Sequence, residues 1–137
     1  MNAPLSTVAV GEEVRHLSST RSKRATAYQV QLVPVVRAVL IDTARRQTTI
    51  TYGELCHAIQ AFSPRSVGGL LDTVWLDCIK RGEPSLANLV VGTNGVPGSE
   101  FLVTLDRKKE SFDSSAAHLK KWEQFKQDCY AYWAIKS

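Results

Sequence analysis

The sequence predicts an α+β fold, in which one domain, residues 27–137, follows an N-terminal arm. The pattern from Ile50 to Phe101 runs helix, turn, helix, strand, glycine-rich turn, strand, which is the order of elements in a winged helix-turn-helix. The chain has 137 residues, of which 44% are apolar, so it can bury the core of one such domain. Helical apolar spacing from about Ser115 to Ile135 predicts an additional C-terminal helix.

Residues 1–26 are predicted to form a flexible basic arm. The segment is rich in serine, threonine and charge, and it lacks apolar periodicity. A basic arm can follow the phosphates of a nucleic acid, but the same composition is also typical of a solvated tail. The cations of the arm that lie close together are Arg15, Arg21, Lys23 and Arg24.

The first helix of the domain is predicted from Val33 to Arg46. Its apolar residues recur at three- and four-residue spacing, which places them on one face of a helix. Pro34 fits the first turn, where the amide hydrogen that proline lacks has no helical partner. The residues that define the face are Val33, Val36, Leu40 and Ala44.

Two helices joined by a turn are predicted next. Thr51 and Glu54 have the spacing of a capping box, and the helix that they begin should reach about Ala61. Ser63 is the expected N-cap of the second helix, with Pro64 at its first position. The apolar positions that keep helical spacing in this second helix are Val67, Leu70, Leu71, Val74, Trp75, Cys78 and Ile79.

Two strands are predicted after the second helix. Leu86–Val91 is an apolar run, Asn94–Gly95 is a strong turn signal, and Phe101–Leu105 should be the returning strand. One side of the C-terminal helix is rich in aromatic residues, which we interpret as core packing rather than as a surface for a partner. That side carries Leu119, Trp122, Phe125, Cys129, Tyr132 and Trp133.

Composition limits the classes of function. The net charge of +4 permits an anionic partner without requiring one. The three cysteines lack C-x-x-C spacing, the three histidines lack metal-ligand spacing, and there is no glycine motif for phosphate, so no metal or cofactor is expected. Without a run of membrane-spanning length or an apolar signal core, we expect a cytoplasmic protein with no membrane partner.

Three motifs occur in the order found in one known family. Tyr52–Leu55 is similar to a T-Y-G-E-[LIV] helix start, Arg65–Gly69 to an R-A-V-G recognition helix, and Leu89–Gly95 to an R-V-V-G-x-x-G segment. Across roughly half of its length, the chain therefore resembles the DNA-binding domain of the alkylguanine-DNA alkyltransferases and the alkyltransferase-like proteins. The resemblance implies a winged helix that binds DNA.

The chain departs from this family at the reactive position. The family run P-C-H-R-V-V, aligned on Val90 and Val91, places Ala87 at the reactive cysteine and Asn88 at the histidine. Alanine has no nucleophile and asparagine cannot take the proton, so we expect no alkyl transfer and no enzyme. Cysteine-less relatives bind damaged DNA without repairing it. They generally keep the histidine and arginine that Asn88 and Leu89 replace here.

The resemblance assigns DNA contacts to the helix-turn-helix. It implies that Arg65 enters the DNA stack in place of a flipped base and that Tyr52 presses on a phosphate. Ser66 should face the same groove as Arg65. Gly68 and Gly69 are costly inside a helix, which indicates close approach of another backbone, either DNA or a neighbouring helix. A solvated arginine and a packed tyrosine remain open alternatives.

Further DNA contacts are expected outside the second helix. The turn from Asn94 to Gly98 would act as the wing. Phosphates would be contacted by the N-terminal arm and by Lys80, Arg81, Lys108 and Lys109. The leading prediction is a non-catalytic DNA-binding protein with no small-molecule cofactor.

The alternative is a protein-protein interaction or adaptor module on the same fold, because a fold does not determine a function. Asp72 and Asp77 lie on the second helix of the helix-turn-helix, and they would repel phosphates if they faced outward. A continuous positive surface around Arg65 would favour DNA, whereas a neutral apolar surface would favour a protein partner.

Overall fold

Helices account for most of the backbone that the structure describes. The structure is a computed structural model that describes residues 6–15, 22–97, 102–103, 109–110 and 116–135. Its elements, in chain order, are β1 (Glu13–Arg15), β2 (Ser22–Arg24), α1 (Ala27–Arg45), β3 (Ile50–Thr51), α2 (Tyr52–Ile59), α3 (Gly68–Arg81), the 3-10 helix η1 (Leu86–Leu89), β4 (Val90–Val91), β5 (Leu102–Val103), β6 (Lys109–Glu110) and α4 (Ala116–Trp133).

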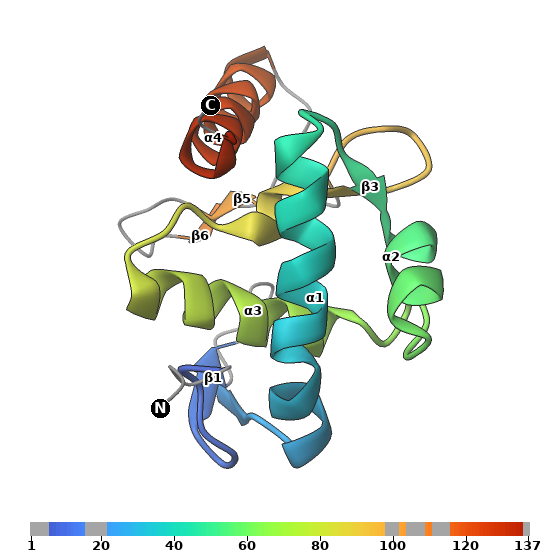
Figure 1. Ribbon diagram of the computed structural model, residues 1–137, viewed down its shortest axis with the longest axis vertical. Coiled ribbons are helices and arrows are strands. Elements are labelled where there is room, and N and C mark those ends of the chain that lie inside the picture. The colour runs from blue at the N-terminus through green and yellow to red at the C-terminus, as the bar shows by residue number, and fades with distance from the viewer. Residues whose placement is uncertain (1–5, 16–21, 98–101, 104–108, 111–115, 136–137) are drawn as a thin grey trace.

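The helices are arranged around α1. In Figure 1, α3 crosses α1, α2 lies to one side, α4 lies at one end of α1, and the β1–β2 hairpin lies at the other end. This mixture of helices and short paired strands confirms the α+β prediction. None of the described helices combines the length and the apolar character that a bilayer crossing requires.

α1 begins well before the predicted start at Val33. Thr26 is its N-cap: the hydroxyl accepts from the Gln29 amide at 3.1 Å, and the Gln29 side chain accepts from the Thr26 amide at 3.0 Å. Pro34 therefore lies inside the helix, where it removes one backbone hydrogen bond, and not in the first turn. The predicted apolar face is confirmed, because its members are buried: Val33, Val36, Leu40 and Ala44.

α2 begins as predicted. Thr51 and Glu54 form the capping box, and both of its hydrogen bonds are 3.0 Å long. The helix ends at Ile59, because Gln60 adopts the left-handed conformation with φ of 57°. The end therefore falls slightly before the predicted one.

α3 begins at Gly68, later than the predicted start at Pro64. The amide of Val67 donates to the carbonyl of Ser63 at 2.9 Å, so the chain makes a separate turn before the helix. The N-cap of α3 is Val67, which has no side-chain group that could cap a helix. We call residues 60–67 the α2–α3 loop.

The predicted hairpin between Leu86–Val91 and Phe101–Leu105 differs from the structure. The residues of η1 form a 3-10 helix, and only the end of the first run, β4, is extended. β4 pairs in parallel with β3, so that Ile50 lies opposite Val90. Among the described residues, β5 pairs with β6 and not with β4. β4 therefore joins η1 to β3, the strand that directly precedes α2.

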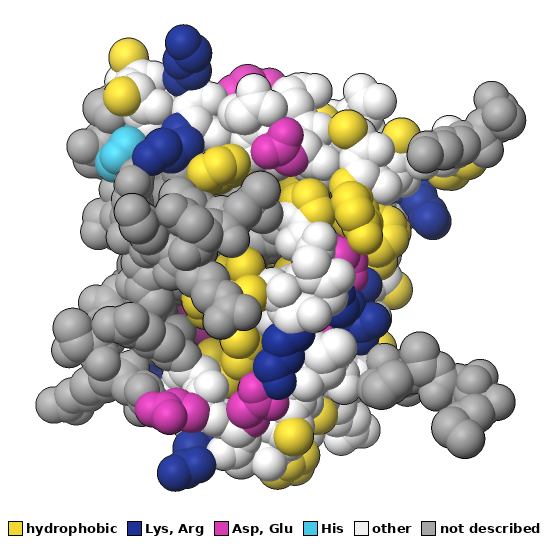
Figure 2. Space-filling view, turned by 90° about the vertical axis from the view of Figure 1, so that its left-hand side faces the viewer, with side chains coloured by type: hydrophobic (Ala, Val, Ile, Leu, Met, Phe, Trp, Pro, Cys, Tyr) yellow, Lys and Arg dark blue, Asp and Glu magenta, His cyan; other side chains and the backbone are white. Residues whose placement is uncertain are grey.

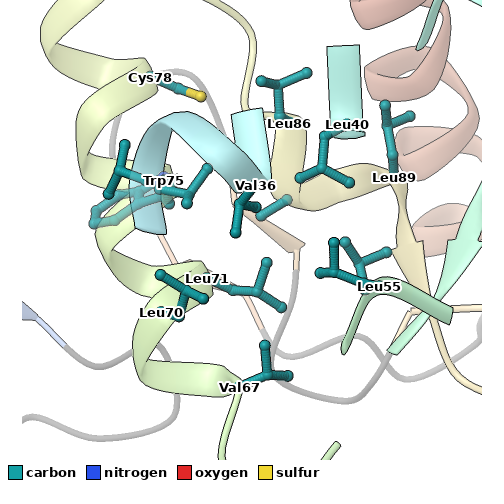
Figure 3. Close-up of a cluster of buried hydrophobic side chains, with 14 of the residues drawn as sticks. Val36, Leu40, Leu55, Val67, Leu70, Leu71, Trp75, Cys78, Leu86 and Leu89 are labelled. Carbon is teal, nitrogen blue, oxygen red and sulfur yellow. The ribbon is translucent and has the colours of Figure 1, made fainter. Parts of the chain in front are cut away.

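The core lies where α1, α2, α3 and η1 meet. Figure 3 shows side chains from these elements directed toward one another, including Leu40 of α1, Leu55 of α2 and Leu71 of α3. α3 is enclosed along its middle, because every residue of Leu70–Trp75 is buried. A helix turns once in 3.6 residues, so an uninterrupted buried run of this length leaves no open side.

The N-terminal segment is packed onto α3 where the sequence predicts a flexible arm. Val8, Val14 and Ala25 are buried and form a small cluster against the helix. The hydroxyl of Thr7 donates to the Asp77 carboxylate at 2.6 Å. This corrects the prediction for residues 6–15 and 22–26. The three buried side chains are too far apart in the sequence to produce a periodic pattern.

α4 covers η1 and one end of α1. Trp122 and Cys129 are buried, as predicted, and the indole N–H of Trp122 donates to the carbonyl of Asn88 at 2.9 Å. Leu119 and Tyr132, which the prediction places in the core, are exposed instead. At 100° per residue they lie on the two edges of the stripe that Trp122 and Cys129 define.

Candidate nucleic-acid interface

Among the described residues, the middle of α3 is closed to a partner. The middle of the helix is enclosed, and the β1–β2 hairpin packs against it. A recognition helix that lies in a groove needs an open flank. In this structure, contact with a nucleic acid through α3 would therefore have to use one of its ends, and the N-terminal end continues into the α2–α3 loop.

Lys80 and Arg81, two of the predicted phosphate contacts, form ion pairs with carboxylates of the same chain. Lys80 forms an ion pair with Glu12 and donates to the carbonyl of Thr7 at 3.0 Å. Its hydrogen bond lowers the pKa of the Glu12 carboxyl. Arg81 Nε lies 2.9 Å from Oδ2 of Asp77. A phosphate would have to compete with these carboxylates.

The acidic residues of α3 face inward. Asp72 is buried, and Asp77 is fully buried. Asp77 Oδ2 lies 3.3 Å from Nη1 of Arg37, which also donates to the Glu83 carboxylate from Nη2 at 3.0 Å. This buried network joins α3 to α1 and to the segment that follows α3. Asp77 therefore forms no outward acidic surface that would repel phosphates, whereas Asp72, although buried, lines a small pocket beside the start of α3.

The α2–α3 loop places Arg65 and Ser66 at the surface. Both side chains are exposed. The hydroxyl of Ser66 accepts a hydrogen bond from the amide of Ser63 at 2.9 Å, which holds the turn in shape. No described carboxylate forms an ion pair with Arg65. Its guanidinium thus differs from Arg81, whose charge is already compensated.

The N-terminal ends of α1 and α3 lie side by side. A Cβ on Gly69 would lie 2.8 Å from Nε2 of Gln29, in the first turn of α1, so the group that approaches Gly69 is a side chain of the neighbouring helix and not the predicted backbone. Gly68 has open space at the same position. Neither helix has an acidic residue in its first turn. Both therefore present the positive end of the helix dipole without a compensating carboxylate there.

A small pocket of about 130 Å³ lies at this meeting point. Lys23 and Arg24 of β2 contribute to its wall, and both side chains are exposed. Two cations of the N-terminal segment thus lie close to the two helix ends. The full lining is Val14, Lys23, Arg24, Thr26, Gln29, Gly69, Asp72 and Thr73.

The other predicted contacts lie elsewhere. Tyr52 packs against the core and its hydroxyl oxygen is buried. Asn94 is exposed, and its side chain accepts from the Val96 amide at 3.3 Å. Figure 1 places this turn beside β3, away from the α2–α3 loop. Lys108 and the side chain of Lys109 lie outside the described part of the chain.

The face turned away from α2 has no basic surface in its described part. Figure 2 shows lysine and arginine side chains interspersed with aspartate and glutamate side chains on this face. Neighbouring charges of opposite sign cancel at a distance, so this surface would not attract a polyanion. The end formed by the α2–α3 loop is the better candidate.

Two aromatic rings meet at that end. Tyr28, in the first turn of α1, stacks on Phe62 of the α2–α3 loop with ring centroids 5.5 Å apart and an interplanar angle of 25°. The spacing of Thr26 and Gln29 is that of a capping box, which is a sequence signal for a helix start around Tyr28. No pattern in the sequence brings Phe62 against it.

The position of the family's reactive cysteine is inside the protein. Ala87 and Asn88 lie on η1, and both are buried. The cysteines that the chain does have, Cys56, Cys78 and Cys129, are buried too. Burial raises the pKa of all three thiols, to about 12 for Cys78 and for Cys129. Thiols with such pKa values are almost entirely protonated at neutral pH, and the nucleophile is the thiolate.

We expect no transfer of an alkyl group to this protein. After incubation with an oligonucleotide that contains an alkylated guanine, mass spectrometry should find the protein mass unchanged. The physical reason is that Ala87 offers no nucleophile and that the thiols are buried in their protonated form. An alkyl adduct on any cysteine would contradict this expectation.

Comparison with known proteins adds no family. No protein-family model, curated protein or solved structure matches the chain. The resemblance to the alkyltransferase domains therefore rests on the three motifs and their order. The structure contains the two helices and the loop to which the first two motifs belong.

Proposed function

We propose that the protein is a non-catalytic DNA-binding protein whose helix-turn-helix contacts DNA through the α2–α3 loop and the adjoining ends of α1 and α3. The observation that carries the proposal is that the exposed Arg65 lies three residues before the start of α3, which meets the start of α1 at Gly69 and Gln29, and that neither helix has an acidic residue in its first turn. Arginine and the amides of a helix N-terminus both bind phosphate oxygens. We interpret the domain as a winged helix in which the turn around Asn94 replaces a paired wing.

Lys23 and Arg24 support the same surface. They lie at the pocket between β2 and the two helix ends, so a phosphate backbone bound at these helix ends would pass close to them. In this arrangement DNA meets the end of the helix-turn-helix rather than the flank of α3. The binding should weaken as salt is raised, because each phosphate contact releases condensed counterions.

Arg65→Ala is expected to preserve the fold and weaken DNA binding. The loss should be about 1–3 kcal/mol if Arg65 reads a base. If it contacts only phosphate, the loss should be similar for all sequences and the slope of log affinity against log salt should fall by about one. Fluorescence anisotropy with labelled DNA across a salt series measures both quantities.

Arg46→Ala is the matched control for Arg65→Ala. Arg46 is an exposed arginine at the opposite end of α1, where it pairs with Asp42 at 3.0 Å. The two variants lose the same formal charge, and the sites differ in position and in the pairing of Arg46 with Asp42. If both variants lose the same affinity, the effect reflects net charge and not a contact made by Arg65. If Arg65→Ala binds DNA as tightly as the wild type, DNA is bound by another surface.

A protein-interaction module is the second candidate. The observation that favours it is the exposure of Tyr132 and Ile135 at the C-terminal end of α4. Exposed apolar side chains of this size occur at protein interfaces. If the wild-type protein binds no DNA even at low salt, this candidate replaces the first.

A further inference from the structure

The Tyr28–Phe62 pair is a surface feature anchored in the core. Phe62 is half-buried and packs against the main cluster of buried side chains. Tyr28 lies on the outside of this ring and has 52% of its surface exposed. The core therefore holds Phe62 in place, and Phe62 in turn packs against the ring of Tyr28, which is largely outside the core.

The backbone at Phe62 is held in an unfavourable conformation. Its φ of 63° lies in the left-handed region, which bulky residues rarely adopt. The conformation directs the loop so that the Phe62 ring meets Tyr28. Strain of this kind persists only where the surroundings enforce it, and it is often found where a chain binds a ligand.

The charge around the pair suits a nucleic acid. The α2–α3 loop contains no acidic residue, and neither does the first turn of α1. Arg65 follows Phe62 by three positions in the chain. An aromatic surface next to a cation is the combination by which proteins hold single strands, because the ring stacks on a base and the cation binds the phosphate.

We propose that the Tyr28–Phe62 pair stacks on an unpaired base, and that the protein prefers single-stranded DNA to duplex DNA at this end. Bases inside a duplex already stack on their neighbours, so only an unpaired base can offer its face to Tyr28. Arg65 would then bind the adjoining phosphate. The inference rests on the proposed DNA-binding function and deepens it, because it names the form of DNA.

Three probes separate stacking from phosphate contact. The first is a labelled single strand of about 12 nucleotides, which falls within the site size of small single-strand-binding domains. The second is the same strand with abasic sites in its centre, which keeps the phosphates and removes the bases. The third is the duplex of the same sequence. Affinities are measured by anisotropy for the wild type, Tyr28→Ala, Tyr28→Phe and Tyr132→Ala.

The wild type should bind the single strand about tenfold more tightly than the abasic strand. Tyr28→Ala should lose about tenfold on the single strand and nothing on the abasic strand, so that the two probes become equal. Tyr28→Phe should keep the wild-type affinity, because it retains the ring. Tyr132→Ala removes a comparably exposed tyrosine from α4 and should leave all three affinities unchanged.

Equal wild-type affinity for the single and abasic strands would overturn the inference, and so would a loss in Tyr28→Ala that is the same for single strand and duplex. If duplex binding depends on Arg65 while Tyr28→Ala changes nothing, the stacking site is refuted and the proposed function stands. If no probe binds, both fail. Thermal unfolding of each variant confirms that a lost affinity is not a lost fold.

Discussion

Replacing Arg37 by alanine is expected to lower the free energy of unfolding by about 3–5 kcal/mol, the range found when one partner of a buried ion pair is removed. Arg37 is 9% exposed and lies between two carboxylates, Asp77 at 3.3 Å and Glu83 at 3.0 Å. Without the guanidinium, these groups would remain buried with less compensating charge. Urea denaturation followed by far-ultraviolet circular dichroism measures the change.

Arg46→Ala is the control for Arg37→Ala. Arg46 also belongs to α1 and also pairs with an aspartate, but its side chain is 73% exposed. Exposed ion pairs contribute about 0–1 kcal/mol, so this variant should be nearly as stable as the wild type. If the two variants lose similar amounts of stability, burial does not strengthen the Arg37 network.

The second large effect is expected at Trp122. Trp122→Ala should cost about 3 kcal/mol or more, because it leaves a cavity where a large buried ring was. The ring packs with Val91, Val96 and Phe125, and its N–H donates to the carbonyl of Asn88. Thermal and urea unfolding both report the loss.

Two further variants separate the contributions of the hydrogen bond and of burial at Trp122. Trp122→Phe keeps an aromatic ring but leaves the carbonyl of Asn88 without its donor, so it should cost less than Trp122→Ala, with about 1 kcal/mol from the hydrogen bond. Leu119→Ala removes an exposed side chain of the same helix and should be nearly neutral. A fully stable Trp122→Ala protein that loses a partner would make α4 an interface.

The elements that the sequence predicts well are those specified by near neighbours. The Thr51–Glu54 capping box acts within one turn, and the structure contains both of its hydrogen bonds. The apolar spacing of α3 likewise marks a helix that is buried. The start of α1 had an equally local signal in Thr26 and Gln29, and the stronger local preference of Pro34 for a first turn obscured it.

The elements that the sequence predicts poorly depend on distant partners. Val90 is extended because it pairs with Ile50, and no local pattern specifies that partner. The sequence does not show that Asp77 is buried, because its partners Arg37 and Thr7 belong to distant parts of the chain. The N-terminal hairpin packs on α3, which lies far from it in the sequence, so no local pattern predicts the contact.

The candidate site divides in the same way. Arg65 is exposed, but it lies in the α2–α3 loop and not in the first turn of the second helix, where the sequence places it. The pairing of Lys80 with Glu12 could not be predicted, because Glu12 belongs to a segment predicted to be flexible. Tyr28 and Phe62 come together only because α1 starts early and the α2–α3 loop turns back onto it.

The N-terminal segment leaves the ribosome long before the helix on which it packs. Thr7 and Asp77 are 70 residues apart in the chain. At about 5–20 residues per second, translation takes roughly 4–14 s to cover that separation. During this time Val8 and Val14 lack the surface of α3 against which they pack in the native state. β1 and β2 can therefore reach their native place only after α3 has been synthesised.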